Sequence, residues 1–150
     1  MTSTRVESTA DLVNSGTMVL RSSTLTATSY TQTAGSTRLQ ARSRITADTH
    51  IIGGSFGVNG FVDGDLTLGP GAITRVQVRP VGPLWLTVSG KATLGGTLSV
   101  NTTDGTQLDL TQARRFLKAG SRQGEYDSRE GNVPAYAVEY RTDGALLVHQ

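Results

Sequence analysis

The chain has 150 residues, of which 18 are glycine, 4 are proline and none is cysteine, and its formal net charge at pH 7 is +2. A chain without cysteine has no disulfides, thiolate metal sites or cysteine nucleophile. Its arginines are scattered, with no basic run beside aromatic residues, which argues against nucleic-acid binding. The length suggests one domain, and an aromatic content of 5% predicts a narrow aliphatic core.

Residues 1–11 are polar and lack the apolar stretch of a signal peptide. No window of the sequence is apolar for long enough to suggest a membrane-spanning helix. We therefore expect a polar N-terminal tail. We also expect the chain to be a fragment of a larger secreted or cell-surface protein, with a cytoplasmic location as the alternative.

Residues 12–106 contain a repeat, marked by four Leu-Thr or Ile-Thr pairs at nearly equal steps along the chain. A period of about 20 residues, in short segments of alternating polarity, is typical of a β-solenoid. Since side chains alternate between the faces of a strand, the first residue of each pair should point inward and the second outward. The expected inner ladder is Leu25, Ile45, Leu66 and Leu86, and the expected outer ladder is Thr26, Thr46, Thr67 and Thr87.

A second, looser series marks another face of the predicted coils. It runs through Thr17, Thr37, Ser55, Thr74 and Thr97. Glycine-rich turn signals separate the two faces, as expected where each coil reverses within a few residues. The inward residues predicted here are Met18, Leu20, Leu39, Phe56, Val58, Val76, Val78, Leu98 and Val100.

Residues 107–150 depart from the period and are predicted to form a C-terminal cap. The segments 135–140 and 145–150 flank Arg-Thr-Asp-Gly, which favours a β-hairpin. Within 109–120 two interpretations stand, a short helix followed by a strand, or a further coil strand.

Several segments resemble a known family. They are SYTQTAGSTRLQ (29–40), LTVSGKATLGGTLSV (86–100), LVNSGTMVL (12–20) and RRFLKAGSRQGEYDS (114–128). They are similar to repeats in the passenger domains of autotransporter-type secreted proteins, over roughly residues 12–128. The resemblance implies a right-handed parallel β-helix, here of about five coils, in a secreted or cell-surface adhesin-like protein.

The densest pair of carboxylates is Asp63 and Asp65, on either side of Gly64. They are weak candidates for a Ca²⁺ site, because Ca²⁺ prefers oxygen ligands. The simpler interpretation is a turn between coils. The repeat spacing also stacks Asp65 on Arg44, a geometry suited to a salt bridge. No cofactor or resident metal is expected.

No catalytic set is recognisable, since His50 and His149 stand alone and no G-x-S-x-G motif occurs. We expect a non-enzymatic structural or adhesive module. The alternative is a carbohydrate-binding or carbohydrate-cleaving β-helix, whose candidate contacts are Trp85, Tyr30 and Phe61. The expected partners are a second copy or an upstream continuation at the N-terminal edge, and a surface glycan or protein, without nucleic acid or membrane insertion.

Overall fold

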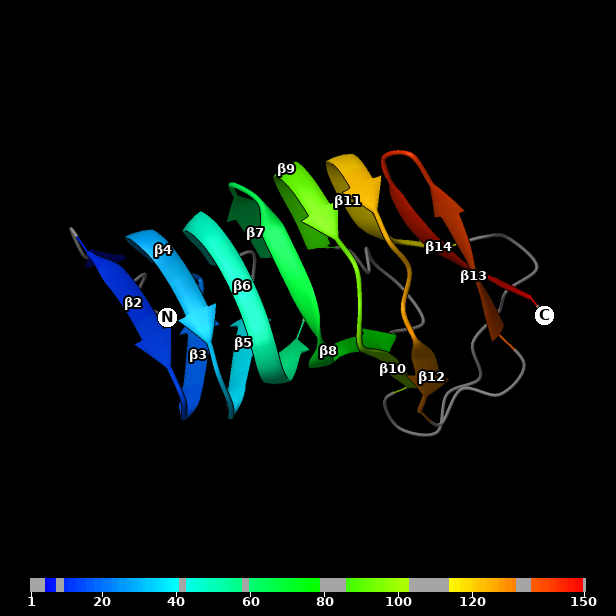
Figure 1. The fold of residues 1–150 in the computed structure, drawn as a ribbon, viewed down its shortest axis with the longest axis horizontal. Coiled ribbons are helices and arrows are strands. Elements are labelled where there is room, and N and C mark those ends of the chain that lie inside the picture. Colours follow the sequence, from blue (N-terminus) through cyan, green and yellow to red (C-terminus); the bar gives the residue numbers. More distant parts are fainter. Residues whose placement is uncertain are drawn as a thin grey trace.

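The structure is a computed structural model that describes residues 5–7, 10–40, 43–57, 60–78, 86–102, 114–131 and 136–149. These residues form strands and turns without a helix, which confirms the all-β prediction (Figure 1). Accordingly, no candidate for a membrane-crossing helix occurs in the described part of the chain. The strands are β1 (Arg5–Glu7), β2 (Asp11–Asn14), β3 (Thr17–Arg21), β4 (Thr24–Gln32), β5 (Ser36–Gln40), β6 (Ser43–Gly57), β7 (Gly60–Asp63), β8 (Leu66–Val78), β9 (Leu86–Thr93), β10 (Thr97–Thr102), β11 (Arg114–Gln123), β12 (Ser128–Glu130), β13 (Tyr136–Arg141) and β14 (Gly144–His149).

Parallel pairing arranges these strands in three rows. Row 1 joins 5–7, 24–26, 44–46, 61–63, 86–88 and 117–119. Row 2 joins 11–14, 29–32, 48–51, 66–68, 92–93 and 122–123. Row 3 joins 17–21, 36–40, 55–57, 73–78, 97–102 and 128–130.

The chain visits row 1, row 2 and row 3 in that order six times, and each such passage is called a round here. Long strands bend from one row into the next, as β6 does across all three rows. As a result β6, β7, β9 and β8 close a ring of four parallel pairings.

The rounds differ in length mainly at one corner, between row 3 and the next row 1. Two residues separate the described strands there after β3, β5 and β6, seven separate β8 from β9, and eleven separate β10 from β11. A single period therefore does not describe the whole chain.

The predicted inner ladder changes rows at its third member. Leu25 pairs with Ile45, and Thr26 with Thr46, as the repeat predicts. Ile45 and Thr46, however, pair with Val62 and Asp63, because the third round is shorter than the spacing of the Leu-Thr and Ile-Thr pairs. The step from Ile45 to Leu66 overshoots this round and reaches row 2.

Leu66 is fully buried in row 2, where it pairs with Thr49 and Ala92. Its neighbour Thr67 pairs with His50 and Thr93. Leu86 and Thr87 lie in row 1 and pair with Leu117 and Lys118. The two ladders drawn from the sequence therefore each combine residues of two rows.

Row 3 places two threonines inside the core. One inward column runs Met18, Thr37, Phe56, Thr74 and Leu98. Thr37 and Thr74 are buried, and the Thr74 hydroxyl has no hydrogen-bond partner in the described structure. The adjacent inward column contains Leu20 and Leu39, then Val76 and Val100. Val58 and the side chain of Val78 lie outside the described residues.

Within the predicted capping region, strands β11 and β12 pair in parallel with β9 and β10 and so add a sixth round. Residues 114–120 are strand, which favours the second interpretation of 109–120; residues 103–113 lie outside the described part. The expected hairpin is formed by β13 and β14, and β14 pairs antiparallel with β11 to cover the end of row 1.

Four glycines form the corner between rows 2 and 3. Gly35, Gly54, Gly96 and Gly124 have φ values of 80°, 78°, 73° and 77°, in the left-handed region that glycine adopts readily. A Cβ on Gly54 would lie 2.2 Å from the carbonyl oxygen of Gly35 in the preceding round. Close contact between successive rounds therefore requires glycine here.

We predict that Gly54→Ala lowers the free energy of unfolding by about 2 kcal/mol or more, since the left-handed conformation alone costs about 1–2 kcal/mol and the steric clash adds to it. Gly57→Ala is the matched control. Its new Cβ would meet Arg38 at an ordinary 3.5 Å, and replacing glycine by alanine in a strand is expected to stabilise by about 0.5–1 kcal/mol. Denaturant unfolding of both variants measures the difference, and equal effects would contradict the corner geometry.

Candidate functional site

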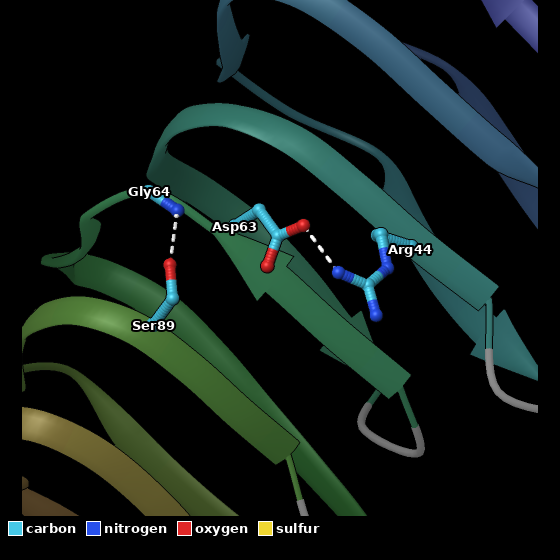
Figure 2. A network of polar contacts seen from close by, with 4 residues as sticks. All are labelled: Arg44, Asp63, Gly64 and Ser89. Atoms are coloured by element: carbon cyan, nitrogen blue, oxygen red, sulfur yellow. Dashed lines mark hydrogen bonds and ion pairs between the residues drawn. The ribbon is translucent and has the colours of Figure 1, made fainter.

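One polar surface cluster lies where the third and fourth rounds meet in row 1. Strand pairing places Arg44 opposite Phe61 and Thr46 opposite Asp63. The guanidinium of Arg44 forms an ion pair with Asp63 Oδ2 (Figure 2). Its central carbon lies 4.9 Å from the centroid of the Phe61 ring. The predicted partner of Arg44 was Asp65; the short third round brings Asp63 there instead. Because both charged side chains are about two-fifths exposed, the pair contributes modestly to stability.

The turn Asp63–Gly64–Asp65 connects three successive rounds. The Gly64 N–H donates to Ser89 Oγ of the fifth round at 2.9 Å (Figure 2). The Lys91 N–H of the same round donates to Asp65 Oδ1 at 2.8 Å. Towards the third round, the Asp65 N–H donates to Asp48 Oδ1 at 3.0 Å. Side chains here satisfy backbone N–H groups that strand pairing leaves over at the corner.

The carboxylates proposed for Ca²⁺ already have protein partners. Asp63 is paired with Arg44, and Asp65 accepts from a backbone N–H of the next round. Among the described residues, no group of three or more His, Cys, Asp or Glu side chains is placed to hold a metal ion. In this structure the carboxylates of Asp63 and Asp65 link one round to the next.

Tyr30, a predicted sugar contact, is instead fully buried in row 2. Its hydroxyl lies 2.6 Å from Thr37 Oγ1, which donates to Gln32 Oε1 at 2.5 Å. Gln32 Nε2 in turn donates to the carbonyls of Gly53 and Ser55 in the next round, at 2.9 and 3.0 Å. An aromatic residue within the core cannot stack on a sugar, so Tyr30 is excluded as a contact residue.

This buried network was missed from the sequence. Tyr30, Gln32 and Thr37 lie on two rows, and their sequence spacing gives no sign that they meet inside the stack. Gln32 and Thr37 are both 0% exposed, a rare position for polar side chains unless their hydrogen bonds are made. The sequence signal that could have revealed the network is the presence of polar residues, Gln32 and Thr37, at positions where the alternation of the strands predicts inward side chains.

A second polar cluster closes the C-terminal end. The Arg122 guanidinium lies 5.0 Å from the Tyr140 ring centroid, and its Nε donates to the Arg141 carbonyl at 2.6 Å. The Tyr140 hydroxyl accepts from the Tyr126 N–H at 3.0 Å. Arg129 donates to the Tyr136 carbonyl at 2.8 Å. These contacts fasten the hairpin and its turn to the last round.

The remaining candidates do not come together. Phe61 is half-buried beneath Arg44, and Trp85 lies outside the described residues. His50 is exposed in row 2 between Thr31 and Thr67, while His149 ends β14 and its side chain lies outside the described part. The sequence-based sugar contacts therefore do not form a described site.

The comparisons with known proteins give no relative for this chain: no family model matches it, and neither do the curated proteins or the solved structures.

The four tyrosines predict alkaline destabilisation. Burial raises the pKa of Tyr30, Tyr126, Tyr136 and Tyr140 above the usual 10. The folded state then keeps protons that the unfolded state releases, so stability is fully present below pH 10 and decreases as pH rises through and above it. We expect denaturant unfolding to show this loss between pH 9 and about 11.

Tyr30→Phe isolates one contribution to this loss. At neutral pH it should cost about 0.5–1.5 kcal/mol, because the hydrogen bond to Thr37 disappears. Above pH 10 the difference from the unaltered chain should shrink, because the phenol no longer titrates. A constant difference across this range would contradict the buried position of Tyr30.

Proposed function

We propose that the chain forms a right-handed parallel β-helix and acts as a non-enzymatic structural or adhesive module of a secreted or cell-surface protein. The observation that carries the proposal is the sixfold repetition of the three parallel rows. Right-handedness is supported by the strong preference of connections between parallel strands for that hand. Such a stack is a rod whose length grows with each round, at about 4.8 Å per round.

The use of the polar side chains supports a structural role. Arg44, Ser89 and Asp65 each contact a neighbouring round, and Gln32 does so within the core. A carbohydrate-binding or carbohydrate-cleaving β-helix would need aromatic or acidic groups directed at a ligand. Among its candidates, Tyr30 is inside the core and the Phe61 ring carries Arg44.

Duplication of one round tests the β-helix on which this function rests. Strand pairing aligns Thr24 of the second round with Arg44 of the third, so residues 24–43 make up one complete round. Two extra copies of residues 24–43, inserted in tandem after residue 43, should each pair with the next. We expect a cooperatively folded protein about 10 Å longer by small-angle X-ray scattering. Insertion of the same residues in shuffled order is the control and should not fold into a longer particle.

A closed barrel would respond differently. Extra residues would interrupt its ring of strand pairs, and the insertion would destabilise the protein without lengthening it. That outcome would contradict the β-helix.

We further propose that the N-terminal edge binds a second copy or continues into an upstream segment. Strands β1, β2 and β3 each pair on one side only within the described structure. Val13 and Val19, on β2 and β3, are 66% and 46% exposed. At the other end, β14, the β13–β14 turn and Tyr136 contact the last round. Association through the free edge would satisfy its unpaired backbone groups.

Light scattering tests self-association at this edge. We expect a concentration-dependent increase in mass that Val13→Lys reduces, because a lysine on an edge strand opposes pairing with another strand. Ile52→Lys is the matched control, since Ile52 is also exposed but belongs to a central round. A monomer at every concentration, or an equal response of the two variants, would contradict self-association at this edge.

A further inference from the structure

The outer face of row 3 carries arginines in the first, second and fourth rounds. Its strand segments, residues 17–21, 36–40, 55–57, 73–78 and 97–102, contain no aspartate or glutamate. They carry Arg21, Arg38 and Arg75. The described acids of the same rounds lie on rows 1 and 2 or at the corner between them; these are Glu7, Asp11, Asp48, Asp63 and Asp65. The acidic side chains of these rounds are thus kept off row 3, which runs along the lower side of Figure 1.

Two of these arginines belong to one column. Strand pairing aligns Val19, Arg38, Gly57, Arg75 and Ser99 in five successive rounds. Arg38 and Arg75 are exposed, and neither makes an ion pair or side-chain hydrogen bond within the described structure. Two steps of pairing separate them, which is about 10 Å between their backbones.

Gly57 puts no side chain between the two arginines. A Cβ at Gly57 would meet the stem of Arg38 at an ordinary contact distance of 3.5 Å, so a side chain can be added at this position without a clash. Ser36 and Ser55 stand two residues before Arg38 and Gly57, on the same outward side of their strands, and both are half-buried. The face therefore offers two unpaired guanidinium groups with hydroxyl groups beside them.

We propose that this row 3 face binds a linear acidic polysaccharide, with its anionic groups following the column along the stack. Guanidinium groups bind sulfate and carboxylate through paired hydrogen bonds. Two cations spaced along the stack match a polymer with anions at regular intervals, and the serine hydroxyls suit sugar hydroxyls. Single-stranded nucleic acid fits less well, because the outward positions of this column hold no aromatic side chain on which bases could stack.

This inference goes beyond the structural role, because a rod can act as a module with or without a polyanion-binding face. It also uses none of the aromatic residues considered for neutral sugars. If the polysaccharide proposal failed, the outcome expected from the round-duplication experiment would be unchanged.

Binding to immobilised dextran sulfate and to hyaluronan, with neutral dextran as the uncharged reference, tests the proposal. We expect Arg38→Gln combined with Arg75→Gln to weaken binding to one or both acidic polymers about tenfold or more, and to reduce its salt dependence by about two counterions. Lys91→Gln combined with Lys118→Gln is the matched control. It also removes two exposed cations, but one lies just before row 2 and the other in row 1, and it should change affinity less than about twofold.

A second pair of variants keeps both arginines. Gly57→Glu places a carboxylate between them and should abolish binding, whereas Gly57→Gln, of similar size, should retain most of it. Circular dichroism and thermal unfolding confirm that each variant is folded.

Three results would overturn the proposal: no binding to either acidic polymer, equal losses in the arginine and lysine double variants, or no difference between Gly57→Glu and Gly57→Gln. Tighter binding to oligothymidylate than to both polysaccharides, lost in the arginine variant, would assign the face to nucleic acid instead.

Discussion

Parallel backbone pairing between successive rounds is the interaction on which the rest of this structure depends. Each round leaves its N–H and C=O groups pointing along the stack, where only the rounds before and after can satisfy them. A single round would therefore be unstable alone, and stability comes from stacking. The side-chain contacts between rounds, from Arg44 to Asp63 and from Gln32 to Gly53, reinforce a register that the backbone already defines.

Close stacking also explains why the corners are so restricted in sequence. Where row 2 turns into row 3, the left-handed glycines place their Cα next to a carbonyl of the previous round. Any larger residue would push the rounds apart and weaken the pairing on both sides. The abundance of glycine thus follows from strand spacing rather than from a need for mobility.

The sequence predicted the all-β class, the repeated strands and the C-terminal hairpin, because alternation and turn residues are local signals. It misplaced Leu66 and Leu86 relative to Ile45, because register depends on the length of each round, and the third round is short while the fourth is long. It also placed Tyr30 at the surface. A tyrosine within a polar segment is expected to be exposed, and the sequence does not show that the Tyr30 hydroxyl contacts Thr37 inside the stack. The column of Arg38 and Arg75 was equally hidden, since residues so distant in the sequence come to share a column only once the register is known.

Variation in round length is concentrated at one corner, where connections of two residues grow to seven and then eleven while the rows continue undisturbed. Sequence can therefore be added at this corner without shifting any strand pair, whereas the glycine corner stays short, with two to four residues between the strands that it separates. Such a molecule can accept insertions along one longitudinal edge while its glycine corner stays short. Foreign peptides could be grafted along the same edge, and the spacing between paired strands would set the distances between them.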